Sequence, residues 1–389
     1  CLPNFGDETG AITALRDAGV PILVQAYPDE LDKMDFANRR DAFCGKFSVM
    51  DVFCQYGVPF TTFAPHTVHP RSAAFSEHLH QFAAVCRIVN KLRRLTVGAI
   101  GARTTAFKAV RFDELTLQRY GITVETLDLS DIFLRMRDVK TSSAVFRVKE
   151  RRLRNYTSWR GVPAAKFKTL VKLGIVIDEL IAEYDMDCLA LRCWLELERE
   201  FGIAPCVILS EINDRGIAAA CELDVCNAVA MCALGLASQR PSTCLDWNNN
   251  YGDEPDKCIL FHCGPVPRSL MAGPGRIVDH PMFAKTLKQG CGIGCNVGRI
   301  APSAMTFASS KTTDGKLSFY LGQGEFTDDP IADDFFGCAG VAHVEKLQHA
   351  LEFIGHAGYR HHVGVTAGHV AQSVHEALTR YFGIEVTKL

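Results

Sequence analysis

The sequence lacks an excess of charge of either sign. Its 389 residues include 42 Lys and Arg against 44 Asp and Glu, which leaves a formal net charge of -2 at pH 7. Proteins that bind nucleic acid or a membrane surface normally show a basic excess or a basic stripe. The one basic cluster, residues 149–154, is typical of a solvated segment between elements. We therefore expect neither nucleic acid nor membrane as a partner.

Long apolar runs are also missing, and no signal-peptide pattern is visible in the sequence. No apolar stretch reaches the ~20 residues that a membrane helix needs. The 16 cysteines are scattered, and many lie in apolar runs, where a free thiol behaves as a small hydrophobic side chain. This favours a reducing, cytoplasmic location without a disulfide framework. Because the chain opens at Cys1 in what resembles the loop after a strand, we also expect that an N-terminal portion is absent.

Several common enzyme motifs are absent as well. The segment 98–101 lacks the full Gly-x-Gly-x-x-Gly of a dinucleotide site, and no phosphate-binding Gly-x-x-x-x-Gly-Lys-Ser/Thr loop or Gly-x-Ser-x-Gly elbow occurs. The close pair Cys291 and Cys295 lacks the second pair or neighbouring histidine of a zinc site. Hydride transfer, phosphoryl transfer and serine hydrolysis therefore lack their usual sequence marks.

The apolar pattern predicts two consecutive doubly wound α/β domains, at 1–93 and 94–240, because strands and helices alternate in both. The expected strands are 20–26, 95–103, 123–129, 188–193 and 206–210, and the expected helices are 12–18, 48–56, 72–92, 166–184, 195–201 and 225–238. Asp224 is well placed as the N-cap of the last of these helices.

Residues 241–389 are predicted to form a mainly β C-terminal domain with a terminal helix. Helical periodicity fades after Pro241, and Gly and Pro become frequent. Short strands are expected at 258–262, 304–309 and 316–321, and the helix at 368–382. Asp314-Gly315 is a strong hairpin turn signal between two of the strands.

At three places in the sequence, polar residues occupy positions where polarity is costly. Glu222 lies in the apolar approach to a helix, where a carboxylate needs a cation or dense hydrogen bonding. Asp246 ends a short strand, the usual ligand position in α/β proteins, and His361 and His362 precede the last helix. Each also fits a structural role: an ion pair with an arginine for Glu222, an Asx turn for Asp246 and a loop position for the histidines.

Taken in order, these segments resemble the L-fucose and L-arabinose isomerase superfamily, and more closely its L-fucose isomerase C-terminal-like branch. The residues that support the resemblance are 220–231, the strand ending in Asp246, and 360–369, with further support from 4–7, 41–45, 101–103 and 336–340. The resemblance implies two α/β domains followed by a β-rich domain, an aldose–ketose isomerase activity, and a homo-oligomer in which a neighbour's first domain completes the pocket.

The resemblance also implies a Mn2+ site at the domain junction, with a Glu, an Asp and a late His as ligands. These fall on Glu222, Asp246 and His362, with His361 or His369 as alternatives for the last. Mg2+ or Co2+ would suit the same donors. A cation chelating O1 and O2 of an open-chain sugar stabilises the enediolate of the reaction. A neighbouring carboxylate can carry the proton, so we expect Glu222 as ligand and base and Asp246 as ligand and partner acid or base.

Further residues are candidates for contacting the sugar. They are Trp247, Asn248, Asn249, His262 and Arg103, of which His262 fits a buried core position equally well. Several arginines offer the forked donors that bind an anionic group, namely Arg40, Arg103, Arg111 and Arg268, and Arg40 or His66 of a neighbouring copy would be contributors in trans. An isomerase of a sulfonated sugar such as sulfoquinovose is therefore an alternative. A non-catalytic sugar-binding module is another, and it would need neither buried carboxylates nor a metal.

Overall fold

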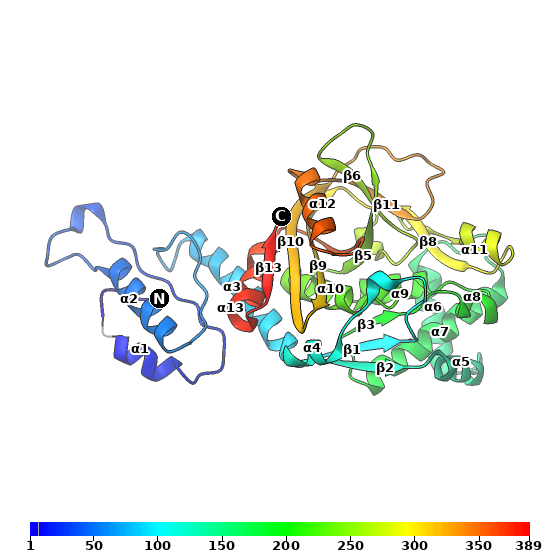
Figure 1. The fold of residues 1–389 in the computed structure, drawn as a ribbon, viewed down its shortest axis with the longest axis horizontal. Coiled ribbons are helices and arrows are strands. Elements are labelled where there is room, and N and C mark those ends of the chain that lie inside the picture. The colour runs from blue at the N-terminus through cyan, green and yellow to red at the C-terminus, as the bar shows by residue number, and fades with distance from the viewer. Residues whose placement is uncertain (7) are drawn as a thin grey trace. The chain divides into compact units, whose positions relative to one another are not determined.

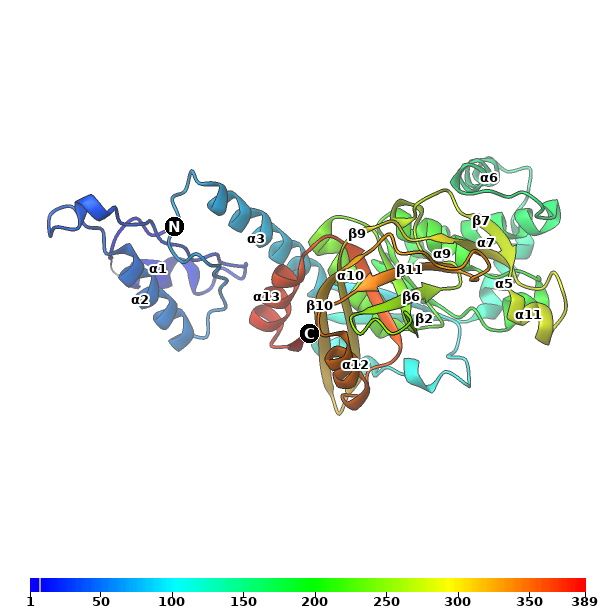
Figure 2. The same cartoon turned by 90° about the horizontal axis from the view of Figure 1, so that it is seen from above.

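A computed structural model of the protein describes residues 1–6 and 8–389. They form two compact units, the first made of residues 1–91 and 372–385 and the second of residues 92–371 and 386–389. Figures 1 and 2 show the helices and strands of each unit. In the described part of the chain, no helix is long and apolar enough to cross a membrane. Asp7, the last residue of the segment 4–7, lies outside the described residues.

Helices supply most of the regular structure in the first unit. They are α1 (Glu8–Leu15), α2 (Ala42–Gln55), α3 (Ala73–Leu92) and α13 (Ala371–Phe382), with a 3-10 turn at Leu31–Lys33. The prediction of a strand at 20–26 is wrong, because this segment makes only isolated parallel bridges, such as that between Leu23 and Thr61. Pro21 removes one amide donor at its start, which disfavours a continuous ladder.

A four-stranded parallel sheet forms one layer of the second unit, in the order β2-β1-β3-β4. The strands are β1 (Leu95–Ile100), β2 (Ile122–Leu127), β3 (Cys188–Leu191) and β4 (Ala218–Cys221). The helices are α4 (Glu114–Arg119), α5 (Leu129–Asp138), α6 (Ala144–Tyr156), α7 (Ala164–Glu183), α8 (Glu196–Glu200), α9 (Cys206–Asp214) and α10 (Val225–Ser238). Strands β3 and β4 are buried along their whole length, as parallel strands covered by helices are.

A nine-stranded sheet forms the other layer, in the order β13-β10-β9-β12-β5-β6-β11-β8-β7. Its strands are β5 (Ser242–Asn250), β6 (Lys257–His262), β7 (Arg276–Asp279), β8 (Ile293–Arg299), β9 (Ser303–Thr313), β10 (Lys316–Phe326), β11 (Cys338–His343), β12 (His362–Ala367) and β13 (Glu385–Lys388), joined by helices α11 (Pro281–Thr286) and α12 (Leu347–His356). Helix α10 contacts strands of both sheets, so it lies between them.

The α/β class and the mainly β C-terminal part are confirmed. Helix α10 has the predicted bounds, and the Asp224 carboxylate accepts a hydrogen bond from the backbone N–H of Asn227 as its N-cap. The predicted hairpin is also present, because Thr313 pairs with Lys316 across Asp314-Gly315. The division into three domains at 93 and 240 remains a prediction about the organisation of the chain.

Two further predicted segments differ in the structure. The strand expected at 206–210 is the first half of helix α9, whose residues 206–213 are all buried. A short run that is apolar on every side fits a buried strand and a buried helix equally well. The basic cluster 149–154 is helical rather than a solvated connection, and the ammonium group of Lys149 is buried between the carboxylates of Asp178 and Glu211.

Candidate functional site

The pairing of strands β5 and β12 brings Asp246 and His362 together. The two strands are antiparallel, and Asp246 lies directly opposite His362. Directly opposed residues of an antiparallel pair project to the same face. The Asp246 Oδ1 atom is 3.5 Å from His362 Nε2. Asp246 was expected to end its strand, but β5 continues through Asn250, so the carboxylate lies within the strand.

Glu222 reaches the same histidine from the turn between β4 and α10. Its Oε2 atom is 3.3 Å from His362 Nε2, and its side chain is 11% exposed. Glu222 and Leu223 both have a left-handed backbone, with φ of 60° and 64°. Such residues cost on the order of 1–3 kcal/mol each and persist where the surroundings dictate the conformation. The turn therefore holds Glu222 between the two sheets of the unit at an energetic cost.

A buried ion pair fixes the orientation of His362. Its Nδ1 atom is 2.8 Å from the Oδ2 atom of Asp224, and the same carboxylate accepts a hydrogen bond from Arg360. Burial favours the neutral acid, but the charges of Arg360 and His362 hold the pKa of Asp224 well below its usual range. An ionised Asp224 requires a proton on His362 Nδ1, which leaves Nε2 to face Glu222 and Asp246.

The acidic groups around His362 stabilise a positive charge on or beside its ring. Burial opposes its protonation, but Cys244, Asp224 and Glu222 outweigh burial and raise the pKa of His362. Within the described chain, His362 Nε2 and Asp246 Oδ1 are buried atoms without a hydrogen-bond partner. Buried polar atoms normally have partners. Two carboxylates that converge on one imidazole are a donor set that fits a divalent cation.

The other two late histidines differ in position. His361 is half exposed, and its Nε2 atom is 3.7 Å from Asp246 Oδ1. Ligand atoms of Glu222, His361 and His362 lie within 4.8 Å of one another. His369 is exposed, and its Nε2 atom is 3.2 Å from the carbonyl oxygen of Gly324. The geometry favours His362 as the ligand, with His361 at the rim of the site.

Of the predicted sugar contacts, His262 lies beside the site. It is buried, its ring centre is 5.8 Å from that of His362, and its Nε2 atom has no partner among the described residues. Trp247 projects to the opposite face of β5, where its indole N–H donates to Tyr320. The guanidinium of Arg103 donates to carbonyl oxygens of its own loop, and Asn248 and Asn249 are exposed. The roles of all these residues as sugar contacts remain predictions.

Sequence reasoning missed three residues of this site. Asp224 was expected only as a helix cap, whereas its second carboxylate oxygen binds Arg360 and His362. The Glu-x-Asp spacing and the arginine before the histidine pair were available signals. Cys244 lies two residues before Asp246 on β5, hence on the same strand face.

Comparison with known proteins finds two isomerase family models and several isomerases that are similar to this chain. The family model described as "Fucose/sulfoquinovose isomerase, N-terminal domain" matches residues 1–93, and "L-fucose isomerase, C-terminal domain" matches residues 260–389. A sulfoquinovose isomerase of Alkalicoccus urumqiensis is 25% identical over 328 residues, which cover 82% of this chain and 71% of the relative. A sulfoquinovose isomerase of Priestia aryabhattai is 26% identical over 327 residues, 82% of this chain and 69% of the relative.

Proposed function

We propose that this chain, an isomerase of the L-fucose isomerase superfamily, interconverts an aldose and its ketose with a divalent cation held by Glu222, Asp246 and His362. Mn2+ is the first candidate, and Mg2+ and Co2+ are alternatives. One observation carries the proposal: two carboxylates converge on His362 Nε2, whose ring is oriented by an ionised aspartate. A module that only binds sugar needs no such arrangement.

The reaction moves one proton from C2 to C1 of the open-chain sugar and a second from O2 to O1. A bound divalent cation supplies stabilisation of the negative charge that develops on the two sugar oxygens. Glu222 is proposed to take the C2 proton and return it to C1, and Asp246 to move the hydroxyl proton between the oxygens. With the cation held at Nε2, His362 would be neutral, and Asp224 would keep its single proton on Nδ1.

The substrate is proposed to be a sugar with an anionic group. The relatives named sulfoquinovose isomerase support this choice. Arg360 is not free to bind the anion, because Asp224 already pairs with it in the buried interior. The anion is therefore proposed to bind Arg103, or Arg40 and His66 of a neighbouring copy. Arginine suits this role because its planar group binds sulfonate-like oxygens through two donors.

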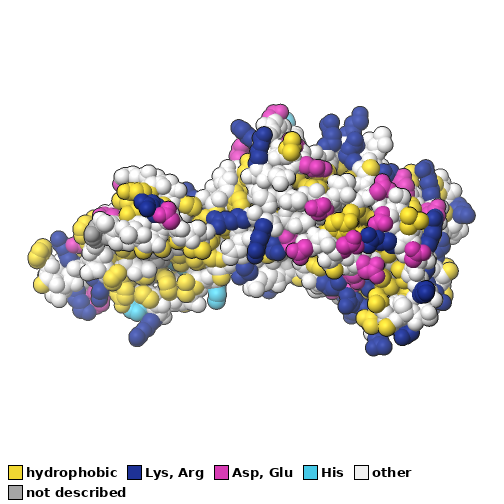
Figure 3. Space-filling model, turned by 90° about the horizontal axis from the view of Figure 1, so that it is seen from below, with side chains coloured by type: hydrophobic (Ala, Val, Ile, Leu, Met, Phe, Trp, Pro, Cys, Tyr) yellow, Lys and Arg dark blue, Asp and Glu magenta, His cyan; other side chains and the backbone are white. Residues whose placement is uncertain are grey.

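A homo-oligomer is part of this proposal. The first unit exposes several large hydrophobic side chains, which include Leu31, Phe36, Phe43 and Phe47. Figure 3 shows hydrophobic side chains gathered on one face of this unit, where charged side chains are few. Contiguous exposed apolar surface commonly marks an interface between proteins.

The test is an aldose panel assayed in heavy water with added Mn2+, comparing each neutral aldose with its sulfonated counterpart. The proposal expects ketose formation with deuterium at C1, faster for the sulfonated sugars. Ketose without deuterium would point to a shielded proton or a hydride shift. Equal rates for both kinds of sugar would contradict the proposal of an anionic substrate but not the proposed isomerase activity. Binding without turnover of any aldose would contradict the isomerase itself.

A further inference from the structure

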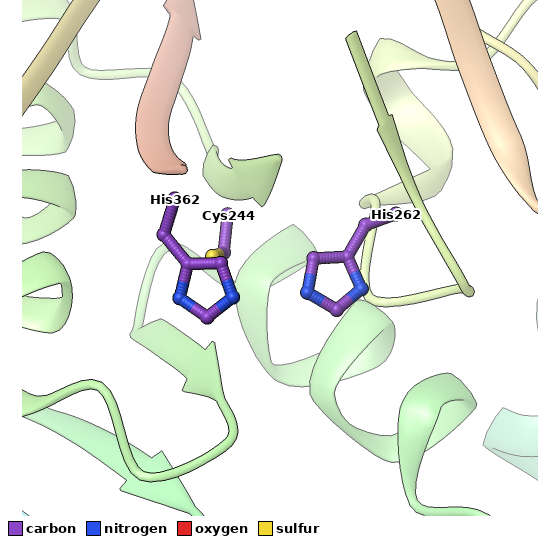
Figure 4. A group of neighbouring side chains, drawn as sticks. All are labelled: Cys244, His262 and His362. Carbon is purple, nitrogen blue, oxygen red and sulfur yellow. The ribbon is translucent and has the colours of Figure 1, made fainter. Parts of the chain in front are cut away.

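A second group of potential metal ligands shares His362 with the site described above. Cys244, His262 and His362 are fully or almost fully buried, and one ligand atom of each lies within 4.8 Å of those of the other two. Figure 4 shows the two imidazole rings facing each other, with the Cys244 side chain beside them. This group contains one sulfur and two nitrogens, and so it differs in chemistry from the two carboxylates of the first site.

The strand order places these three residues on neighbouring strands. Strands β12, β5 and β6 are neighbours in that order. Cys244 and Asp246 are two residues apart on β5 and project to the same face, and His362 lies directly opposite Asp246. His262 ends strand β6 beside them. The Cys244 sulfur therefore lies on the same side of the sheet as the carboxylate of the first site.

The potential donor atoms have few competing partners. In the described chain, the Nε2 atoms of His262 and His362 are both buried without a hydrogen-bond partner. The Cys244 sulfur accepts a hydrogen bond at 3.0 Å from the side-chain amide of Asn227, which favours the thiolate. Asn227 lies in the first turn of helix α10, and its backbone N–H donates a hydrogen bond to the carboxylate of Asp224. Two unpartnered nitrogens and one hydrogen-bonded sulfur thus point into one buried space.

We propose that Cys244, His262 and His362 form a second binding site, selective for a thiophilic cation of the Zn2+ class. Sulfur and imidazole donors favour such cations over Mn2+ or Mg2+, which prefer oxygen. Tetrahedral zinc with bonds of about 2.0–2.3 Å holds its donors roughly 3.3–3.7 Å apart, so the three side chains close slightly around the ion.

Binding of the cation requires that Cys244 lose a proton and that the proton of His262 move from one ring nitrogen to the other. The Cys244 thiol loses its proton to solvent when sulfur binds the cation. His262 Nδ1 now accepts a hydrogen bond from the backbone N–H of Cys263, so the neutral ring carries its proton on Nε2. On binding, that proton moves to Nδ1, where the Cys263 sulfur at 3.2 Å becomes the acceptor in place of the backbone contact. His362 keeps its proton on Nδ1 and binds through Nε2.

The two sites exclude each other, because both need His362 Nε2. A thiophilic cation bound to Cys244 and His262 takes the imidazole away from Glu222 and Asp246. Binding at the second site is independent of the proposed function. The consequence that Zn2+ inhibits by competing with Mn2+ rests on that function.

The test is a titration of the metal-free full chain with Co2+, followed by absorption. A thiolate ligand gives an intense near-ultraviolet charge-transfer band, which oxygen and nitrogen ligands do not give. The wild type is expected to show the band, and Zn2+ is expected to abolish it by displacing Co2+. Cys244→Ser is expected to lose the band, and the matched control Cys258→Ser, in neighbouring strand β6, to keep it. His262→Gln is expected to weaken Co2+ binding with the band on the order of 100-fold.

A second variant distinguishes metal binding at the first site from metal binding at the second. Glu222→Gln is expected to lower Mn2+ affinity, measured by electron paramagnetic resonance, while it keeps the Co2+–thiolate band. A band that survives Cys244→Ser in a chain shown to be folded by circular dichroism would overturn the proposal, as would a band lost in Cys258→Ser. Should Cys244→Ser fail to fold, Cys244→Ala and cadmium–thiolate absorption of the wild type and His262→Gln decide the same question. A band that persists without any Mn2+ binding would contradict only the proposed function.

Discussion

Two buried carboxylates of the second unit have opposite electrostatic surroundings. Asp224 is almost fully buried and is paired with Arg360 and His362. Glu198 in helix α8 is fully buried, and neither of its oxygens has a hydrogen-bond partner in the described chain. The pKa of Asp224 is held well below its usual range, whereas burial raises the pKa of Glu198 to about 8. Burial without a cationic partner therefore favours the protonated acid at Glu198, whereas Arg360 and His362 keep the buried Asp224 ionised.

Removing the partner of Asp224 is expected to have the largest effect. Arg360→Leu leaves a buried carboxylate without its cation, which typically costs about 3–5 kcal/mol of unfolding free energy. Denaturant unfolding at pH 7 measures this loss. The control is Arg137→Leu, which breaks the exposed pair with Glu200 and is expected to cost less than about 1 kcal/mol. Similar losses for both variants would contradict the importance of the buried pair.

Glu198 is expected to show the reverse behaviour. Its folded pKa of about 8 lies above its ordinary value of 4.5, so the folded state holds the proton more tightly than the unfolded state. Stability therefore falls as pH rises through this window. Glu198→Gln removes the penalty and is expected to stabilise the protein by about 2–4 kcal/mol at pH 8.5, and by little at pH 4.

Melting temperatures across this pH range test the Glu198 prediction. The exposed Glu179→Gln in helix α7 is the control and is expected to leave the pH dependence unchanged. A Glu198→Gln variant that is as sensitive to pH as the wild type would show that Glu198 is ionised in the fold.

Asp224→Asn is expected to weaken metal binding about 10–100-fold, because the amide no longer orients and polarises His362. A Mn2+ titration followed by electron paramagnetic resonance measures the change. Asp128→Asn is the matched control, since Asp128 caps helix α5 with its side chain and belongs to no part of the site. If the two variants bind Mn2+ equally well, Asp224 acts only as a helix cap.

Sequence patterns predicted much of the fold, because caps, turns and apolar periodicity are encoded by residues close together in the sequence. Helix α10 was predicted with its N-cap, and the Asp314-Gly315 hairpin is present. The strand expected at 206–210 is helical, because an apolar run buried on all sides carries no period that separates the two. At 20–26 the expected strand reduces to bridges, since Pro21 interrupts the donors.

The residues of the candidate site were predictable from the sequence, but the way in which their side chains converge was not. Family motifs placed Glu222, Asp246 and His362 in order. Their convergence depends on the register of β5 against β12, which no local pattern encodes. The same register brings Cys244 beside His362. The neutral Glu198 shows the limit most plainly, because its segment Glu196–Glu200 is strongly charged and gives no sign that one glutamate is fully buried.

The most direct test of the central claim compares Glu222→Gln with the wild type, in Mn2+ affinity and in aldose–ketose exchange under saturating Mn2+. Glutamine keeps the size of the side chain and removes the charge that binds a cation and accepts the C2 proton. The account predicts weaker Mn2+ binding and an exchange rate lower by about 100-fold or more, since a positioned base contributes typically 10²–10⁴-fold. Full exchange by a folded Glu222→Gln protein would contradict it.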